Sequence, residues 1–344
     1  MRAICKSTAA AGIELIDTCV PKPGERHVVV KVKATSICGT DLHIYQWDPW
    51  AANRIKPPLI FGHEFAGEIV EVGKNVRGVK VGDHISCETH IPCEKCYQCQ
   101  HGQMHLCQHV KIVGIDRPGC FAEYVDIPDI CCVVNNPALP WNIASIQEPF
   151  GNAVYCVSEG NVAGKTVAVF GDGPIGIFTV ALARAYDAKK IIACGMQPYR
   201  LDLMRKYHPD VVVDVRSQDP RVMILEATCG MGVDVVFEIS GSHRAIHDGL
   251  AVVRSGGTFI AFGVPSRPVE IDVAKELIFK GVTLKAIFGR RMFETWDELR
   301  RVIDSGKVNL APIITHEFPL TDFEKAMQLL TSDDVCAGKI VLKP

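Results

Sequence analysis

The stretch KTVAVFGDGPIG, residues 165–176, decides the fold of the second half of this chain. An apolar run of strand length leads into Gly171, Gly173 and Gly176, which match the pattern G-x-G-x-x-G, and a helical pattern follows them. Gly171 permits a tight turn, Gly173 lets the backbone approach a pyrophosphate, and Gly176 allows a helix to pack closely on a strand. The amino-terminal end of the helix then stabilises the phosphate charge. In this strand–turn–helix context the motif predicts a dinucleotide-binding site rather than a purely structural turn.

Five further apolar runs of strand length follow this stretch, and helical patterns lie between most of them. They are residues 190–195, 210–215, 233–240, 257–263 and 282–289. Continuous apolar strands that alternate with helices are typical of a parallel sheet covered by helices on both faces. The sequence therefore predicts an α/β fold with a doubly wound, Rossmann-type domain over residues 151–292.

The first 150 residues have a different pattern, in which short candidate strands are separated by Gly and Pro. HVVVKVKATSI (27–37) alternates apolar and polar residues at a period of two, and residues 64–73 and 78–88 are further candidates. The C-terminal tail holds only helices and a short strand, which would make a poor domain alone. We therefore expect a β-rich domain formed by residues 1–150 together with residues 293–344.

The composition argues against several classes of function. The chain has 344 residues and a net charge of −2, so no basic field favours a nucleic-acid partner. No apolar run reaches the roughly 18 residues that span a membrane, and the first residues lack the apolar core of a signal peptide. We therefore expect a cytoplasmic protein. In a reducing cytosol, clustering among its 15 cysteines indicates a metal or catalysis rather than disulfides.

Four of these cysteines lie in CEKCYQCQHGQMHLC, residues 93–107. Cys93, Cys96, Cys99 and Cys107 follow the spacing C-x2-C-x2-C-x7-C, which suits tetrahedral coordination of zinc. Their charged and polar neighbours indicate an exposed loop, where unligated thiols would oxidise. Because four thiolates leave no position for water or substrate, the sequence predicts a structural zinc ion here.

A second set of metal ligands is dispersed along the first domain: Cys38, His63, Glu64 and Glu148. A Cys, a His and one carboxylate give three protein ligands and leave a fourth position for a substrate oxygen, which is typical of catalytic zinc. Taken singly, a buried Cys38 or His63 is more often a plain core residue. We expect Glu64 to be the third ligand and Glu148 to stand close by, exchanging with Glu64 or relaying a proton. The sequence alone does not decide between the two carboxylates.

Together these motifs resemble the zinc-dependent medium-chain alcohol dehydrogenase family. Cys38, GHEFAG (62–67), the four-cysteine loop and GDGPIG (171–176) occur in that family's order, and the resemblance covers essentially the whole chain. It implies a GroES-like catalytic domain, a Rossmann domain, one catalytic and one structural zinc ion per subunit, and a homotetramer.

Other segments narrow the resemblance. ICGTDLHIYQWDPW (37–50), EPFGNAV (148–154) and FGRRMFETW (288–296) are most similar to family members that oxidise L-threonine to 2-amino-3-oxobutanoate with NAD. The small-molecule substrate implied is therefore L-threonine, and a polyol or another small secondary alcohol is the alternative.

The resemblance also assigns roles to single residues. Thr40 and His43 would relay the hydroxyl proton away from the zinc ion, and His90 would face the substrate, where we expect it to serve the amino-acid carboxylate. The family's nucleotide contacts fall on Ile175, Gly195, Arg200, Phe262, Gly263, Val264, Ala286 and Ile287.

One part of the dinucleotide site departs from the expected pattern. An Asp or Glu should end the second strand, about 20 residues after the glycine motif, and bind the ribose 2′-hydroxyl. That strand ends at Gly195, which has no side chain to accept this bond or to repel the 2′-phosphate of NADP, and Arg200 five residues later can face either group. The sequence therefore leaves NAD and NADP open, although the resemblance implies NAD. Replacing Gly195 with Asp is expected to strengthen the preference for NAD.

Overall fold

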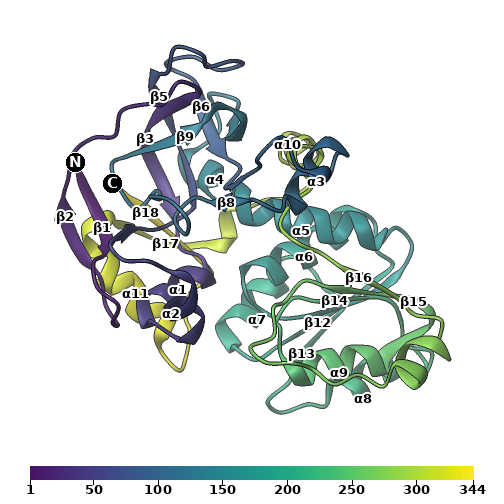
Figure 1. Cartoon of the computed structure of the whole chain (residues 1–344). Helices are drawn as coiled ribbons and strands as arrows, with labels where there is room; N and C mark the ends of the chain where they lie inside the picture. The colour runs from purple at the N-terminus through teal and green to yellow at the C-terminus, as the bar shows by residue number, and fades with distance from the viewer. The chain divides into compact units, whose positions relative to one another are not determined.

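The structure is a computed structural model that describes residues 1–344, and the chain divides into two compact units (Figure 1). The first unit comprises Met1–Pro149, Ile314–Asp333 and Lys339–Pro344, and the second comprises Phe150–Ile313 and Asp334–Gly338. One unit is built on mostly antiparallel sheets and the other on a parallel sheet, so the predicted α/β fold class is confirmed.

The first unit is organised by a seven-stranded sheet. Its strand order is β10 (Cys132–Val134), β6 (His84–Cys87), β5 (Glu64–Val72), β3 (His27–Ser36), β18 (Lys339–Lys343) and β17 (Ile314–Pro319), and β9 (Tyr124–Pro128) also pairs with β3. A three-stranded sheet has the order β2 (Glu14–Asp17), β1 (Arg2–Lys6) and β4 (Leu59–Ile60), and β7 (His90–Ile91) pairs with β8 (Lys111–Ile112).

The helices of the first unit are short. They are α1 (Gly39–Gln46), α2 (Pro49–Arg54), α3 (Tyr97–Gln100), α4 (Trp141–Ser145), α11 (Phe323–Thr331) and the 3₁₀ turns η1 (Met104–Leu106), η2 (Asp129–Cys131) and η5 (Leu320–Asp322). Helix α5 (Gln147–Gly160) begins in this unit and continues into the second.

The middle strand β3 explains how this unit brings distant residues together. It pairs antiparallel with β5 along most of its length, and at its end Ser36 lies opposite Glu64. Strand β18, from the far end of the chain, pairs antiparallel with the same end of β3, with Val341 opposite Ser36. The end of β3, the start of β5 and the C-terminal strand therefore meet at one place.

The strand expected over residues 78–88 is shorter in the structure. Only His84–Cys87 form β6, because the preceding residues make a tight turn. Gly82 has a φ of +90°, and the Lys80 amide donates to Asp83 Oδ2 at 2.9 Å. This Gly-Asp turn interrupts the extended backbone, so the strand begins only at His84.

The second unit is a six-stranded parallel sheet with helices (Figure 1). Its strand order is β13 (Val211–Asp214), β12 (Lys190–Gly195), β11 (Thr166–Phe170), β14 (Val233–Glu238), β15 (Val253–Ala261) and β16 (Thr283–Ala286). Its helices are α6 (Pro174–Ala185), α7 (Pro198–Arg205), α8 (Pro220–Ala227), α9 (His243–Val252), α10 (Glu294–Asp304), the π-helical segment η3 (Val273–Ile278) and the 3₁₀ turn η4 (Ala311–Ile313). The order is that of a doubly wound dinucleotide-binding sheet. No helix of the chain combines the length and apolar composition needed to cross a membrane.

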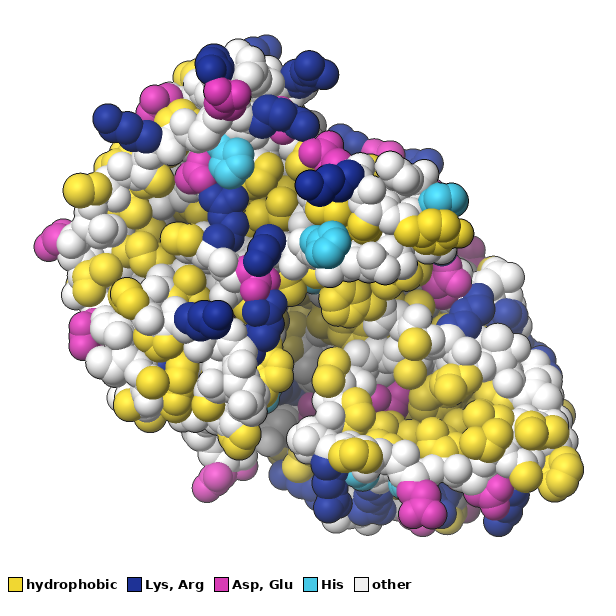
Figure 2. Space-filling model, in the orientation of Figure 1, with side chains coloured by type: hydrophobic (Ala, Val, Ile, Leu, Met, Phe, Trp, Pro, Cys, Tyr) yellow, Lys and Arg dark blue, Asp and Glu magenta, His cyan; other side chains and the backbone are white.

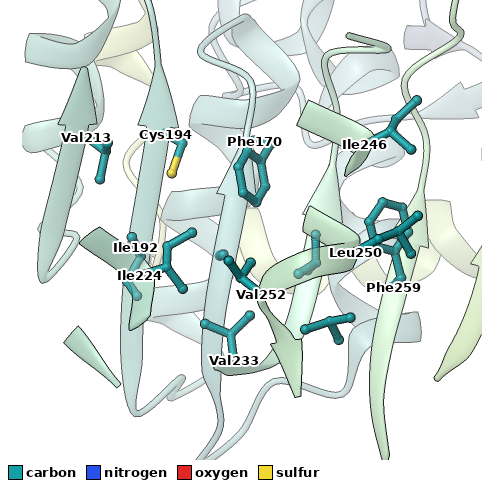
Figure 3. Close-up of a cluster of buried hydrophobic side chains, with 13 residues drawn as sticks. Phe170, Ile192, Cys194, Val213, Ile224, Val233, Ile246, Leu250, Val252 and Phe259 are labelled. Atoms are coloured by element: carbon teal, nitrogen blue, oxygen red, sulfur yellow. The ribbon is translucent and has the colours of Figure 1, made fainter. Parts of the chain in front are cut away.

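A buried hydrophobic cluster holds helices against one face of this sheet (Figure 3). Phe170 of β11, Ile192 of β12 and Phe259 of β15 lie in it with Leu250 of α9 and Ile224 of α8, all less than 3% exposed. Burial of such side chains contributes roughly 1.5–3 kcal/mol each. The packed sheet thus fixes the carboxyl ends of its strands, where the glycine motif lies.

The boundary expected at residue 292 differs from the structure, because α10 belongs to the second unit. Trp296, Leu299 and Val302 are buried on one face of this helix. On another side, Glu298 Oε1 accepts hydrogen bonds from Ser158 Oγ at 2.5 Å and from Tyr186 Oη at 2.7 Å. These contacts tie α10 to α5 and to the end of α6, so the second unit extends to Ile313.

Candidate active site and metal centres

The four-cysteine loop gathers its sulfur atoms as the spacing predicts. The ligand atoms of Cys93, Cys96, Cys99 and Cys107 all lie within 4.8 Å of one another. Cys96 Sγ is 3.5 Å from Cys99 Sγ and 3.8 Å from Cys107 Sγ. The short helix α3 begins directly after Cys96 and carries Cys99, so one turn of helix sets this part of the spacing.

Backbone amides surround these sulfur atoms. The Cys96 amide donates to Cys93 Sγ, and the amides of Cys93 and His109 donate to Cys107 Sγ, each at 3.3 Å. Amide donation lowers the pKa of Cys93, and it lowers the pKa of Cys96 to about 6, whereas burial raises the pKa of Cys99. An arrangement that stabilises thiolates is suited to a thiophilic metal ion.

The dispersed set also comes together. The ligand atoms of Cys38, His63 and Glu64 lie within 4.8 Å of one another. Cys38 is the N-cap of α1, two residues after the end of β3, while His63 immediately precedes Glu64, the first residue of β5. The pairing of β3 with β5 is what places the thiol beside the imidazole and the carboxylate.

The charged and unpaired polar atoms of this group would be stabilised by a bound cation. Burial disfavours a charged imidazole, yet Cys38, Asp41 and Glu148 raise the pKa of His63 to about 10. Burial raises the pKa of Asp41 to about 6. Asp41 Oδ1, His63 Nδ1 and Glu64 Oε1 are buried without a hydrogen-bond partner. An unpartnered buried carboxylate oxygen carries a free-energy cost that a bound metal ion would remove, so a zinc ion held by Glu64 Oε1, Cys38 and His63 fits this donor set.

The two oxygens of Glu64 have different surroundings. Oε2 accepts hydrogen bonds from Ser36 Oγ and from Lys339 Nζ, and Lys339 also donates to Ile37 O at 2.8 Å. Both Glu64 and Lys339 are only 1% exposed. One oxygen is therefore anchored by protein donors, and Oε1 is left for a metal ion.

Glu148 lies outside this ligand group. It occupies the first turn of α5, is buried, and accepts a hydrogen bond from Thr89 Oγ1 at 3.1 Å. Its charge nevertheless acts on His63. Glu148 is therefore a carboxylate near the ligand group, and a hydrogen bond from Thr89 holds it in place.

Thr40 and His43 lie on α1, one beside the sulfur and the other at the surface. Cys38 Sγ is 3.8 Å from Thr40 Oγ1. His43 has an exposed ring whose Nδ1 contacts Asp48 Oδ2 at 2.6 Å, and the ring lies 5.9 Å from that of Trp50. Asp48 is held in turn as the N-cap of α2, where it accepts from the Ala51 amide at 2.9 Å.

His90, three residues before the cysteine loop, is oriented by Glu88. The fully buried carboxylate of Glu88 accepts from the His90 amide at 2.9 Å and lies 3.1 Å from His90 Nδ1. Because an ionised carboxylate only accepts, Nδ1 carries the proton in this pair.

In the second unit, the glycine motif has the conformation that its chemistry requires. Gly171 has a φ of +122°, in the left-handed region that favours glycine. A Cβ added to Gly176 would lie 1.9 Å from the Gly171 carbonyl oxygen, so only glycine fits there. Around Gly173, the N-cap of α6, a Cβ would meet nothing within 4 Å. This opening at a helix N-terminus fits the pyrophosphate of a dinucleotide.

The other candidate nucleotide contacts follow the carboxyl ends of the parallel strands. Gly195 ends β12, Phe262, Gly263 and Val264 follow β15, Ala286 and Ile287 lie at the end of β16, and Ile175 lies in the first turn of α6. In an open parallel sheet this edge is where ligands bind. Arg200, in α7, donates instead from Nε to the Ala337 carbonyl at 2.9 Å, and burial lowers the pKa of its guanidinium.

The side chain of Asp172 fills the space beside Gly195, which the sequence did not indicate. A Cβ added to Gly195 would lie 2.5 Å from Asp172 Cβ and 2.8 Å from Asp172 Oδ2. In Gly195→Asp the new side chain would collide with Asp172, a steric cost that the expected gain in preference for NAD did not include.

Comparison with known proteins decides the family. Residues 24–137 match the alcohol dehydrogenase GroES-like domain, and residues 174–305 match the zinc-binding dehydrogenase domain. An L-threonine 3-dehydrogenase from Bacillus subtilis is 46% identical over 345 residues, covering 100% of this chain and 99% of the relative. The chain belongs to the zinc-dependent medium-chain alcohol dehydrogenase family. The predicted family and its NAD(P)-dependent enzyme class are thereby confirmed.

Solved structures agree with this family assignment. A zinc-binding dehydrogenase from Sinorhizobium meliloti bound to NADP has a TM-score of 0.90 at 27% identity, covering 100% of this chain and 99% of that one. An alcohol dehydrogenase from Escherichia coli complexed with NADH has a TM-score of 0.92 and the same coverage, and at 24% identity it supports the fold alone.

Several residues at these sites were not predicted from the sequence. Ser36, Asp41, Asp48, Glu88, Asp172 and Lys339 hold or neighbour the predicted residues. Only Asp172 had a local signal, since it lies inside GDGPIG. The others are ordinary polar residues whose role depends on the packing of distant strands.

Proposed function

We propose that this chain oxidises the 3-hydroxyl of L-threonine to give 2-amino-3-oxobutanoate, with NAD as the hydride acceptor. The observation that carries the proposal is the full-length 46% identity to the L-threonine 3-dehydrogenase of Bacillus subtilis. The metal-ligand and dinucleotide geometries described above are compatible with this chemistry.

The catalytic metal would be held by Cys38, His63 and Glu64 Oε1. Bound there, a zinc ion is a Lewis acid for the substrate hydroxyl, and the dinucleotide supplies the hydride acceptor. Lys339 and Ser36 orient the Glu64 carboxylate through Oε2. The four-cysteine loop would hold a second, structural zinc ion, giving two per chain.

In this proposal, side chains of the protein carry the proton of the substrate hydroxyl from the site to solvent. Thr40, beside Cys38, accepts the hydroxyl proton in the relay, and His43 passes it to solvent. The contact of His43 Nδ1 with Asp48 orients the exposed ring, and imidazole is the side chain that ordinarily exchanges protons near neutral pH. Glu148, buried near His63, is the second carboxylate of the site and does not serve as a constant ligand.

His90 is the proposed contact for the substrate's amino-acid end. With Nδ1 bound to Glu88, the opposite edge of the ring presents Nε2, which recognises a carboxylate if it is protonated. An alcohol without an amino-acid group would gain nothing from this contact. His90 therefore favours L-threonine over a plain secondary alcohol.

A homotetramer is proposed from the surface of the second unit. Strand β16 is the edge of the sheet, and exposed hydrophobic side chains lie on it and on neighbouring segments: Val264, Val273, Ile278, Phe279 and Leu284. Figure 2 shows hydrophobic side chains gathered on the visible face of this unit. An unpaired edge with exposed apolar groups favours pairing with a second copy. Light scattering should give four chains per particle, and Leu284→Lys should reduce that number.

A reducing, cytoplasmic location is proposed from the cysteines. All fifteen are free thiols in the structure, including the four that lie close enough to compete for disulfides. Such a chain keeps its metal ligands available only where thiols stay reduced.

A substrate panel tests the function. L-Threonine, L-serine, butane-2,3-diol and sorbitol are each offered with NAD and with NADP, and reduced nicotinamide is followed by absorbance. The proposal expects L-threonine with NAD to give the highest kcat/KM, and activity should be lost with EDTA. A higher kcat/KM for butane-2,3-diol or sorbitol would replace L-threonine by the alternative substrate class.

A further inference from the structure

We propose that Asp172, inside the glycine motif, supplies the ribose-binding carboxylate that β12 lacks, and that it makes this chain select NAD over NADP. The inference rests on the proposed function in one respect, namely that the second unit binds a nicotinamide dinucleotide. It adds a specificity-determining residue at a motif position that pattern matching treats as variable.

The steric relationship between Asp172 and Gly195 is the first observation. The Asp172 side chain fills the space into which a side chain at position 195 would project, with 2.5 Å between the two Cβ positions. Real Cβ atoms do not approach so closely, so only one of the two positions can carry a side chain. An acidic side chain at the end of β12 and the side chain of Asp172 would therefore occupy the same space, so the chain can have only one of them.

The hydrogen bonds of Asp172 are the second observation. Its Oδ2 accepts from the Met196 amide at 2.7 Å and from the Gln197 amide at 2.6 Å. The carboxylate is thereby fixed directly after the last residue of β12, where an acid binds the ribose in dinucleotide-binding folds. Both bonds end on Oδ2, so these amides leave the acceptor capacity of Oδ1 unused.

The charges around Asp172 decide which dinucleotide this arrangement favours. Arg200 and Arg216 both feel the charge of Asp172. However, Arg216 is paired with Asp214 through Nε and Nη2 at 3.0 and 2.8 Å, and Arg200 donates to the Ala337 carbonyl. Arg216 is thus neutralised by Asp214, and Arg200 is held through its Nε, so a 2′-phosphate beside Asp172 meets a buried negative charge, whereas a 2′-hydroxyl meets an acceptor.

A purely structural role is the competing explanation, because Asp172 also pins the loop that follows β12. Asp172→Asn separates the two roles. The Asn side chain has nearly the same size and keeps a carbonyl oxygen for the two amides, but it loses the charge. Asp202→Asn is the matched control, since it removes one negative charge from the exposed face of α7 in the same unit.

The relocation variant gives an independent test. Gly195→Asp alone should lower the melting temperature because of the collision with Asp172. In the double variant Asp172→Gly/Gly195→Asp the Cβ at position 172 is removed, so the volume is vacated and the acid moves to the end of β12. This protein should fold and should again prefer NADH.

The measurement is the Kd for NADH and for NADPH, read from nicotinamide fluorescence, together with the melting temperature of each protein. We expect the wild type and Asp202→Asn to prefer NADH. In Asp172→Asn the ratio of the two Kd values should shift toward NADPH by about ten- to a hundredfold, with little change in melting temperature. A ratio unchanged within about twofold in Asp172→Asn overturns the inference, as does a wild type that prefers NADPH. A wild type that binds neither dinucleotide overturns the proposed function as well, which distinguishes the two failures.

Discussion

The ammonium of Lys339 donates a hydrogen bond to the carboxylate of Glu64, although the two residues are 275 positions apart in the chain. Both side chains are almost fully buried, and the same carboxylate oxygen accepts from Ser36. The last strand of the chain therefore holds a proposed metal ligand in place. Lys339 is a positioning residue for Glu64.

Lys339→Met should destabilise the first unit and weaken metal binding. Removing one partner of a buried ion pair leaves an uncompensated charge and costs about 3–5 kcal/mol. Urea unfolding gives this difference, and metal analysis should show partial loss of one zinc ion per chain. Lys343→Met is the control, because its pair with Glu317 is largely exposed and is worth about 1 kcal/mol or less. Equal losses in the two variants would contradict a special role for Lys339.

Cys38→Ser should abolish turnover and leave the fold intact. Loss of a Lewis acid worth several kcal/mol in the transition state corresponds to a fall in kcat/KM of about a thousandfold or more. Metal analysis should find about one zinc ion in place of two. Cys19→Ser, an exposed thiol outside both groups, should keep both ions and full activity. An unchanged kcat in Cys38→Ser would refute the catalytic assignment.

Cys96→Ser, in contrast to Cys38→Ser, should reduce stability before it reduces activity. The loop would lose its metal ion, and the melting temperature should fall before activity does, because a closed four-thiolate site stabilises structure without touching substrate. Calorimetry with parallel zinc analysis separates this from the effect of Cys38→Ser. If the Cys96 variant lost activity at an unchanged melting temperature, the loop would have a direct part in the reaction.

The two metal centres also differ in what the sequence can reveal. Cys93 to Cys107 form one local loop, so their spacing predicts a site without knowledge of the fold. Cys38 approaches His63 and Glu64 only because β3 pairs with β5 in a register that sets Ser36 opposite Glu64. That register, and the arrival of Lys339 on β18, depend on the packing of the whole sheet.

The second unit shows the same division. GDGPIG and the apolar runs predict the parallel sheet, since each is a local pattern. The boundary at Ile313 was missed because α10 is fixed by bonds from Ser158 and Tyr186, which no local pattern indicates. The meaning of Gly195 was missed because it depends on a side chain that is 23 positions earlier in the chain and adjacent in space.

Glu88→Gln should change how His90 meets substrate. A neutral amide at position 88 keeps the side chain's shape but weakens the bond that fixes the proton on His90 Nδ1. We expect KM for L-threonine to rise by about tenfold, with a smaller change in kcat and a shifted pH profile of kcat/KM. The melting temperature and the Kd for NADH serve as controls. Should KM and the pH profile both stay at wild-type values, Glu88 would have only a structural role.

Glu317→Gln should make the stability of the first unit less dependent on pH in the acid range. Lys343 Nζ and Asn142 Nδ2 donate to this carboxylate, and the bond from Lys343 is the larger cause of its lowered pKa. A carboxyl with a folded pKa below its unfolded value of about 4.3 stabilises the folded state above that pH, and this contribution is lost as the pH falls through the folded pKa. Both side chains are at least one-third exposed, so solvent limits the effect to about 0.5 kcal/mol.

Urea unfolding of the wild type and Glu317→Gln at a series of pH values from about 7 down to about 3.5 gives the difference in free energy of unfolding. It should be present at neutral pH and shrink below about pH 4.3. In a Lys343→Met background the same substitution should have a smaller effect at neutral pH. A difference that grows on acidification has the wrong sign for a depressed pKa and would exclude the ion pair as its source.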